Sequence, residues 1–194
     1  MPTAQNVEVA IVGAGFAGVC MAIKLKEAGI DDFVILENGE EAGGTWRDNT
    51  YPGCACDVPS HLYSYSFRLN GEWSEVFPPW QEIRDYLLDC LQHNGLKPYL
   101  RLRTAVKELR FDEKLAAWEL ALSDGQQIRA RFVVAATGPL TKPLLPDVPG
   151  LDSFRGHKIH SARWDHSFPL DGQRVAVIGT GASAIQIVPA IARK

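Results

Sequence analysis

Residues 7–18 read VEVAIVGAGFAG, and this stretch decides the fold. Its first half is apolar apart from one charge at Glu8, which predicts a short buried strand. Gly13, Gly15 and Gly18 then follow in GxGxxG spacing. That spacing allows a tight turn, a close approach of the backbone to a pyrophosphate and close packing of the next helix. The stretch therefore predicts a dinucleotide site in which the phosphates sit at a helix N-terminus.

The chain after this turn completes one βαβ unit. A helix follows, with Gly29 as its left-handed terminator, and residues 33–36 form a second buried strand. Glu37 ends that strand, 24 residues after Gly13, where a carboxylate can accept both hydroxyls of an adenosine ribose. We therefore expect an α/β fold that begins with a Rossmann-like domain.

The middle of the chain predicts loops, one helix and a small antiparallel sheet. Residues 38–80 are irregular yet too apolar for a disordered segment, so we expect structured loops that carry function. The spacing of apolar residues predicts an amphipathic helix at residues 81–93. Residues 106–111, 118–122 and 128–136 alternate or run apolar, which predicts a three-stranded antiparallel β-meander.

A second glycine motif follows a proline-rich stretch. Residues 174–178 predict another strand, and Gly179, Gly181 and Ala184 repeat the motif in its GxGxxA form. A helical segment then runs to the last residue, although Pro189 removes one of its backbone hydrogen bonds. Two dinucleotide motifs suggest a flavin and a nicotinamide, because hydride passes from one to the other.

The segment between the two motifs carries a specific family resemblance. Residues 154–165 read FRGHKIHSARWD, so that Phe154, Gly156, His160 and Trp164 stand in the order FxGxxxHxxxW, followed by Asp. This pattern resembles the fingerprint of the Baeyer–Villiger monooxygenases, a branch of the flavin-containing monooxygenase superfamily. Other segments that resemble this family, in the expected order, are GGTW at residues 43–46, YPGCACD at residues 51–57 and ATG at residues 136–138.

The resemblance implies FAD at the first glycine motif and NADPH at the second. It implies that Gly43 and Gly44 let the backbone approach the flavin, and that Trp46 and Tyr51 line the flavin site. The residues that we expect to contact a cofactor are Gly13, Gly15, Phe16, Gly18, Glu37, Gly44, Thr45, Trp46, Tyr51, Asp57, Thr137, Gly138, Gly179, Gly181, Ser183 and Ala184.

The resemblance also assigns a catalytic role to Asp57. An acid at this place lies near the isoalloxazine and orients an arginine that stabilises a flavin C4a-peroxide, and no residue of this chain is assigned as that arginine. The alternative is that Asp57 caps a loop, because Asp is common in turns. His160 is implied to lie in a linker, either for conformational coupling or as a packed, hydrogen-bonded residue.

The implied reaction is an NADPH-dependent Baeyer–Villiger oxidation. One oxygen atom from O2 is inserted, through the flavin peroxide, into a small organic ketone or aldehyde. One alternative is oxygenation of a nucleophilic nitrogen or sulfur, the other activity of the superfamily. Another is a truncated FAD-binding fragment without activity of its own.

The length of the chain agrees with this organisation. At roughly 150 residues a domain, 194 residues make about 1.3 domains. We expect an FAD-binding domain at residues 1–150, a linker with the fingerprint at residues 151–170 and an incomplete NAD(P)-binding domain at residues 171–194. The partner strand of the second motif would lie beyond Lys194.

Charge and hydropathy argue against several kinds of partner. The 20 Lys and Arg residues against 23 Asp and Glu residues give a net charge of -3, so no basic surface for nucleic acid is expected. Glycines, polar residues and a proline interrupt the uncharged run at residues 175–192, which argues against a membrane span. The sequence predicts nothing about the oligomeric state.

The cysteines and histidines predict neither a disulfide nor a metal site. Four cysteines without a secretion signal indicate reduced thiols and a cytoplasmic protein. Cys54 and Cys56 are too close in sequence for a relaxed bridge or a redox pair. The possible metal ligands, which lack paired zinc-ligand spacing, are Cys54, Cys56, His157, His160, Asp165 and His166.

Overall fold

The computed structural model describes residues 5–192, which divide into two compact units. Unit 1 contains residues 5–45 and 84–139, and unit 2 contains residues 46–83 and 140–192. The outermost residues of the predicted domains 1–150 and 171–194 lie outside the described residues. The predicted boundaries near residues 150 and 170 stay predictions.

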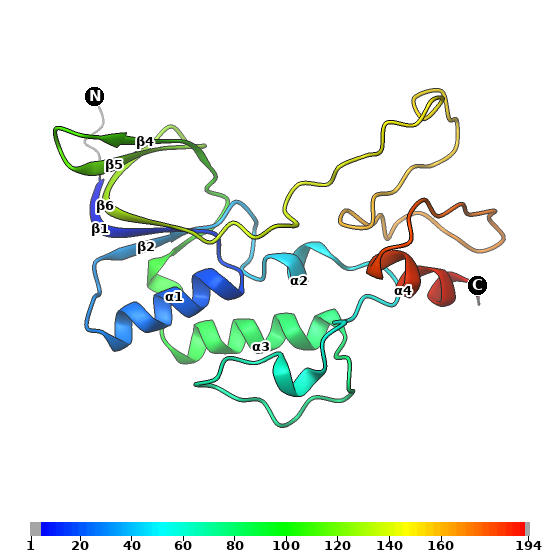
Figure 1. Ribbon diagram of the computed structural model, residues 1–194, viewed down its shortest axis with the longest axis horizontal. Helices are drawn as coiled ribbons and strands as arrows, with labels where there is room; N and C mark the ends of the chain where they lie inside the picture. Colours follow the sequence, from blue (N-terminus) through cyan, green and yellow to red (C-terminus); the bar gives the residue numbers. More distant parts are fainter. Residues whose placement is uncertain (1–4, 193–194) are drawn as a thin grey trace. The chain divides into compact units, whose positions relative to one another are not determined.

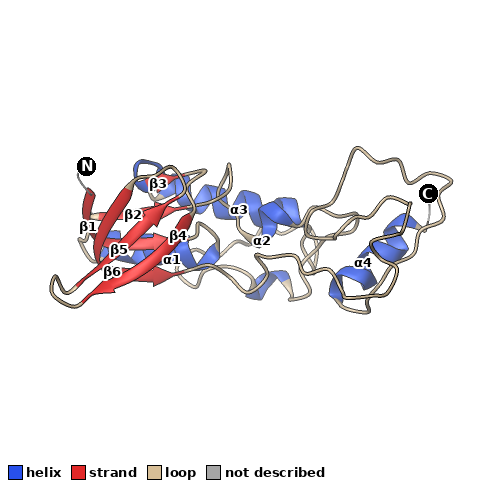
Figure 2. Ribbon diagram, turned by 90° about the horizontal axis from the view of Figure 1, so that it is seen from above, coloured by secondary structure: helices blue, strands red, loops and turns tan. Residues whose placement is uncertain are grey.

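Unit 1 is built on one mixed six-stranded sheet (Figures 1 and 2). Its strands are β1 (Gln5–Val12), β2 (Phe33–Leu36), β3 (Leu100–Arg101), β4 (Val106–Asp112), β5 (Ala117–Leu122) and β6 (Gln127–Ala135). They lie in the order β3-β2-β1-β6-β5-β4. The first four strands of that order are parallel, and β6, β5 and β4 are antiparallel. The predicted βαβ unit and meander are confirmed, and they share one sheet.

The register of the sheet brings three strand ends to the same edge. Val12, at the end of β1, pairs with Leu36 at the end of β2 and with Ala135 at the end of β6. Because these strands are parallel, their carboxyl ends finish level with one another. The residues that follow them therefore lie side by side, at the edge where open α/β sheets bind ligands.

Helices α1 (Phe16–Glu27) and α3 (Trp80–His93) lie on one side of this sheet (Figure 1). Phe16 stacks on Tyr86 with ring centroids 6.1 Å apart. At the other end of α1, Lys26 Nζ donates to the carbonyl of Asn94 at 2.9 Å. The two helices thus run in parallel. The apolar spacing that predicts α3 is explained by the burial of Ile83, Tyr86, Leu87, Cys90 and Leu91.

The apolar core of unit 1 joins the parallel strands to the meander. Its buried side chains are Val7, Ala10, Val34, Leu36, Leu120, Leu122, Ile128 and Ala130. They come from β1 and β2 on one side and from β5 and β6 on the other. The meander is therefore a part of the domain core and not an appendage.

Unit 2 consists mostly of loops, with short helices. These are α2 (Thr45–Asp48, whose first residue belongs to unit 1), the 3₁₀ helix η1 (Ser60–Leu62) and α4 (Ala182–Ile191). Trp46 meets Tyr63 edge to face, with ring centroids 5.6 Å apart, and its indole nitrogen donates to the Tyr63 hydroxyl at 3.0 Å. Buried aromatic contacts of this kind order the loops that the sequence predicts as structured.

The predicted strand at residues 174–178 is wrong. This segment is exposed, has no regular secondary structure and pairs with no strand in the described part of the chain. A strand exists through its hydrogen bonds to a neighbour, so an apolar run alone does not make one. The helix after it ends at Ile191, and the predicted continuation to Lys194 falls on two residues outside the described ones.

Among residues 5–192, no helix is both long and apolar enough to cross a membrane. The apolar run at residues 175–192 contains only the helix α4, of 10 residues.

Gly18 offers a test of the packing of unit 1. A Cβ at this position would lie 1.9 Å from the carbonyl oxygen of Gly13. We expect Gly18→Ala to lower the free energy of unfolding by about 3 kcal/mol, because backbone must shift to relieve the overlap. Gly71→Ala is the matched control, since nothing lies within 4 Å of its Cβ. Urea unfolding of both variants measures the difference, and equal losses would contradict the steric explanation.

Candidate functional site

The first candidate site lies where β1, β2 and β6 end. Gly13 follows β1, Glu37 follows β2 and Ala136 follows β6. The Gly13 amide donates to the carbonyl of Leu36 at 2.8 Å, and the Ala136 amide donates to the carbonyl of Val12 at 2.9 Å. These bonds extend the sheet by one step and fix the chain as it turns away.

The glycines of the first motif are required by backbone packing. Gly13 has a φ of +108°, and a Cβ there would lie 2.4 Å from the carbonyl oxygen of Ala136. Gly18 brings α1 against the Gly13 carbonyl in the same way. Only residues without a side chain allow the strand end, the helix and the start of the 136–138 segment to meet here.

The N-terminus of α1 is arranged as an anion site. Its capping residue, Gly15, is extended, has no side-chain cap, and no acidic residue stands in the first turn. The first backbone N–H groups of the helix therefore point outward, with the positive end of the helix dipole. A pyrophosphate fits this helix N-terminus, because Gly15 has no side chain that would cap its N–H groups.

The GGTW segment closes on the same turn. The Gly43 amide donates to the carbonyl of Ala14 at 3.0 Å. Gly44 has a φ of +54°, and its Cβ would lie 3.1 Å from the Cα of Gly15. Thr45 comes directly after this contact, so the structure brings the two predicted glycine segments together.

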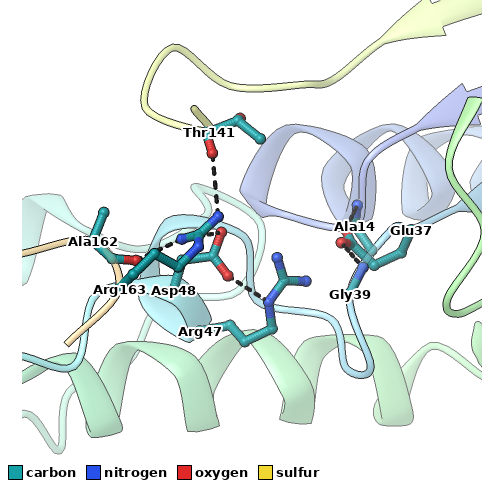
Figure 3. A network of polar contacts seen from close by, with 8 residues as sticks. All are labelled: Ala14, Glu37, Gly39, Arg47, Asp48, Thr141, Ala162 and Arg163. Atoms are coloured by element: carbon teal, nitrogen blue, oxygen red, sulfur yellow. Dashed lines mark hydrogen bonds and ion pairs between the residues drawn. The ribbon is translucent and has the colours of Figure 1, made fainter. Parts of the chain in front are cut away.

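Glu37 is held in place by the glycine turn itself (Figure 3). Its side chain is buried, with 6% exposed. One carboxylate oxygen accepts from the Ala14 amide at 2.9 Å and the other from the Gly39 amide at 2.7 Å. Each oxygen of a carboxylate has a second acceptor position. Glu37 is thus fixed at the strand end by backbone donors on both sides of it.

The second glycine turn repeats the backbone conformation of the first. Gly179 has a φ of +120°, close to the +108° of Gly13. Gly181 caps α4 with φ -75° and ψ 179°, and Gly15 caps α1 with φ -83° and ψ -167°. Ala184, at the third position, shows that this turn tolerates a Cβ. The predicted repeat of the motif is therefore present in the backbone conformation as well as in the sequence.

The YPGCACD segment packs against the helix behind the second turn. Tyr51 is buried and donates to the side-chain oxygen of Gln186 at 2.8 Å. Burial raises the pKa of Tyr51 to about 12, so its phenol stays protonated and remains a donor. Ser183, in the first turn of the same helix, acts on this phenol and lowers its pKa in part. Of the predicted cofactor residues, the structure brings Tyr51 and Ser183 together.

Other predicted site residues are either packed against an aromatic ring or exposed. Trp46 is buried against Tyr63, and Phe16 stacks on Tyr86 at the start of α1. Asp57 lies exposed in a bend. The residues Thr137 and Gly138 are exposed directly after Ala136.

The fingerprint segment forms a hydrogen-bonded turn within unit 2. The ring of Phe154 folds over Gly156, where a Cβ would lie 2.4 Å from it. The imidazole Nδ1 of His160 and the Ala162 amide are 3.1 Å apart, and the Arg163 amide donates to the His160 carbonyl at 2.8 Å. His160 therefore orders the turn through both its side chain and its backbone.

Arg163 ties this turn to α2 (Figure 3). Its guanidinium donates to the carbonyls of Ala162 at 2.5 Å and Thr141 at 3.4 Å, and lies 3.7 Å from the carboxylate of Asp48. Arg47 contacts the other oxygen of Asp48 at 2.8 Å. Two cations thus bracket one half-buried carboxylate.

Gln186 and Arg163 are the functional candidates that sequence reasoning missed. Gln186 is an amide in the apolar run Ile185 to Val188, and this break in hydropathy is the signal that could have found it. Arg163 occupies an unspecified position of the FxGxxxHxxxW pattern, so the pattern gives no signal for it.

The cysteines of unit 2 are buried thiols. Cys54 and Cys56 are both free, and the Cys54 thiol donates to the carbonyl of Asn49 at 3.2 Å. Burial raises the pKa of Cys54 to about 11 and also raises that of Cys56. Among residues 5–192, no group of three or more His, Cys, Asp and Glu residues is placed to hold a metal ion.

Comparison with known proteins agrees with this geometry. The family model "NAD(P)-binding Rossmann-like domain" matches residues 11–78, and "Pyridine nucleotide-disulphide oxidoreductase" matches residues 62–194, more than half of the chain. The chain belongs to the pyridine nucleotide-disulphide oxidoreductase family.

The chain is also similar to monooxygenases. It is 54% identical over 190 residues to a Baeyer-Villiger monooxygenase of Streptomyces coelicolor, with 98% of this chain and 36% of the relative covered. It is 48% identical to a Baeyer-Villiger monooxygenase of Pseudomonas aeruginosa, with 97% and 36% covered. The resemblance carried by the fingerprint is confirmed.

A solved structure shares the fold. The cyclohexanone monooxygenase from Rhodococcus sp. Phi1, bound to NADP+, superposes with a TM-score of 0.91 at 36% identity, over 99% of this chain and 37% of that one. The chain thus spans little more than a third of the length of these relatives.

The buried thiol of Cys54 predicts a pH dependence for this family member. In the unfolded chain the thiol ionises near pH 9, whereas the folded state keeps the proton up to about pH 11. Stability should therefore fall as the pH rises from 9 to 11, because the unfolded state loses its proton first. Cys54→Ala should flatten this fall in urea unfolding measured across the range. An unchanged slope would contradict the contribution of Cys54.

Proposed function

We propose that this chain forms the FAD-binding part and the beginning of the NADPH-binding part of a Baeyer–Villiger monooxygenase. The observation that carries the proposal is the pair of glycine turns with matching backbone conformation, joined by the fingerprint segment. The similarity of the chain to Baeyer-Villiger monooxygenases supports the choice of reaction. In this proposal residues 1–150 form the first domain, residues 151–170 the linker and residues 171–194 the start of the second domain.

FAD would be held by the first turn. The N–H groups at the start of α1 would bind its pyrophosphate, and Glu37 would accept hydrogen bonds from the ribose hydroxyls. The segments of Gly44 and Thr45 and of Thr137 and Gly138 would line the same edge of the sheet. When bound, FAD accepts hydride and activates O2, which is chemistry that no side chain supplies.

NADPH would be held by the second turn. Gly179 and Gly181 would let the backbone approach its pyrophosphate, and Ser183 would offer a hydroxyl at the start of α4. Gly181 has no side-chain cap, and no acidic residue stands in the first turn of the helix. The site therefore presents the same positive end of a helix as the first one.

Asp57 would act as a positioning residue for oxygen transfer. It is an exposed acid that follows the ordered 51–56 segment. In this role its carboxylate orients an arginine elsewhere in the whole protein, and that cation stabilises negative charge on the reacting oxygen.

The proposed substrate is a small ketone or aldehyde, consumed with O2. Solved relatives include cyclohexanone monooxygenases with cyclohexanone or ε-caprolactone bound. We also propose a cytoplasmic location, supported by the free cysteines, among them Cys54 and Cys56.

The whole protein should convert a cyclic ketone into its lactone. We expect a mass increase of one oxygen atom, dependent on NADPH and O2, in a protein that purifies with FAD. Mass spectrometry of the product checks this. Turnover of thioethers or amines alone would favour oxygenation at nitrogen or sulfur, and a colourless protein that takes up no FAD would overturn the proposal.

Asp57→Ala should separate flavin binding from oxygen transfer. We expect the variant of the whole protein to keep its flavin and to be reduced by NADPH, but to release hydrogen peroxide and lose about 10²-fold in product formation. Asp147→Ala, at another exposed acid of unit 2, is the control. Wild-type coupling of NADPH oxidation to product in Asp57→Ala would exclude this role.

A further inference from the structure

One amide side chain connects the helix of the second glycine turn to the 51–57 segment. The Gln186 Oε1 accepts from the Tyr51 hydroxyl at 2.8 Å, and the Gln186 Nε2 donates to the carbonyl of Ala55 at 2.9 Å. The Ala55 amide lies 3.5 Å from the same Oε1. Because the Ala55 carbonyl can only accept, the Gln186 Nε2 must face it, and this fixes the orientation of the Gln186 side-chain amide. Both ends of the Gln186 side chain are therefore committed to this segment.

The backbone of the segment is also shaped to fit α4. Gly53 has a φ of +77°, and a Cβ there would lie 2.7 Å from the carbonyl oxygen of Gln186 and 3.1 Å from the Cβ of Ala190. No larger residue could turn this close to the helix. The 51–57 segment and α4 thus fit one another through backbone packing as well as through hydrogen bonds.

Tyr51 links this contact to the glycine turn itself. Its phenol donates to Gln186, which follows Ser183 by three residues and so shares one face of α4 with it. Ser183 stands in the first turn of the helix, where the proposed nucleotide phosphate would bind. A change at the turn can therefore reach the 51–57 segment along α4, through Gln186 and its contacts with Tyr51 and Ala55.

The far side of the segment is anchored to residues 78–80. The Cys56 amide donates to the carbonyl of Pro78 at 2.9 Å, and the Trp80 amide donates to the carbonyl of Cys54 at 3.1 Å. Ala55 lies between these two bonds and forms a β-bridge with Pro79. The segment is therefore held by α4 on one side and by residues 78–80 on the other. Asp57 follows Ala55 by two residues, so it is close to this anchored point in the chain.

We propose that Gln186 is a positioning residue that couples occupancy of the second glycine turn to the conformation of the 51–57 segment. This inference rests on the proposed function, because it requires a dinucleotide at that turn. A bound pyrophosphate fixes the first turn of α4, and Gln186 and Tyr51 pass that constraint to Ala55 and so toward Asp57. The energetic basis is shared ordering, since a helix already fixed by its ligand orders its partner more completely.

Hydrogen exchange on the whole protein tests this coupling directly. In the wild type, NADP+ should slow amide exchange in peptides that cover residues 182–191 and also in peptides that cover residues 51–57. In Gln186→Ala, slowing at residues 182–191 should remain, whereas slowing at residues 51–57 should shrink by about tenfold, because two hydrogen bonds are lost. Gln81→Ala, at an exposed glutamine of α3, should behave as the wild type.

A purely structural role gives a different result. It would speed exchange at residues 51–57 equally with and without NADP+, leaving the nucleotide-dependent difference intact, and this outcome would overturn the coupling. Protection of residues 182–191 alone by NADP+ in the wild type would overturn it as well. If NADP+ protects neither peptide, the proposed nucleotide site is itself absent and the coupling falls with it.

Two conservative variants keep the test valid if Gln186→Ala unfolds. Gln186→Glu keeps the acceptor for Tyr51 but places an oxygen against the Ala55 carbonyl, and Tyr51→Phe removes only the phenol hydroxyl. Either should reduce the nucleotide-dependent protection at residues 51–57. In thermal unfolding without nucleotide, the combination Tyr51→Phe with Gln186→Ala should cost less than the sum of the two single changes, because both remove the same bond. Additive losses would contradict the shared contact.

Discussion

The contact of the Gly18 Cα with the carbonyl group of Gly13 is the constraint on which unit 1 depends. It sets the angle at which α1 leaves the sheet, because any side chain at Gly18 would overlap the strand end. Gly13 in turn lies against the backbone after β6. Three parallel strands can therefore end level, with a helix N-terminus and the carboxylate of Glu37 at one edge. The binding geometry is a consequence of packing backbone on backbone without side chains.

The second glycine turn shows how much of this geometry is local. Gly179 and Gly181 adopt the conformations of Gly13 and Gly15, although the segment before them pairs with no strand among residues 5–192. Positive φ at the first glycine and the extended helix cap are thus properties of the turn. Strand pairing depends on a neighbouring strand, and without one the exposed residues 174–178 form no strand. The polar contacts of α4 with Tyr51 hold the turn in place instead.

The same distinction explains what the sequence could and could not predict. Periodicity and glycine spacing predict β1, α1, β2, α3 and the meander, since each depends on a buried face or a tight turn within a short stretch. They miss β3, which has 2 residues, and the parallel pairing of β1 with β6, because both depend on residues distant in the chain. The place of Glu37 beside the glycine turn could be predicted, because it follows from the distance of Glu37 to the motif along the chain. The break in hydropathy at Gln186 could mark that residue, but its partners Tyr51 and Ala55 could not be predicted, because they lie more than 130 positions away.

The thiols of unit 2 bear on the proposed monooxygenase reaction. A cysteine that takes electrons from a flavin must reach the thiolate form and approach a second sulfur with relaxed geometry. Cys54 and Cys56 are buried, free and separated by one residue, and burial raises the pKa of both. Protonated thiols of this kind are poor nucleophiles at neutral pH and pack as small apolar side chains. Reduction of a disulfide by this pair is thus disfavoured. In the proposed monooxygenase, protonated thiols in the 51–57 segment would leave the electrons of a reduced flavin for O2.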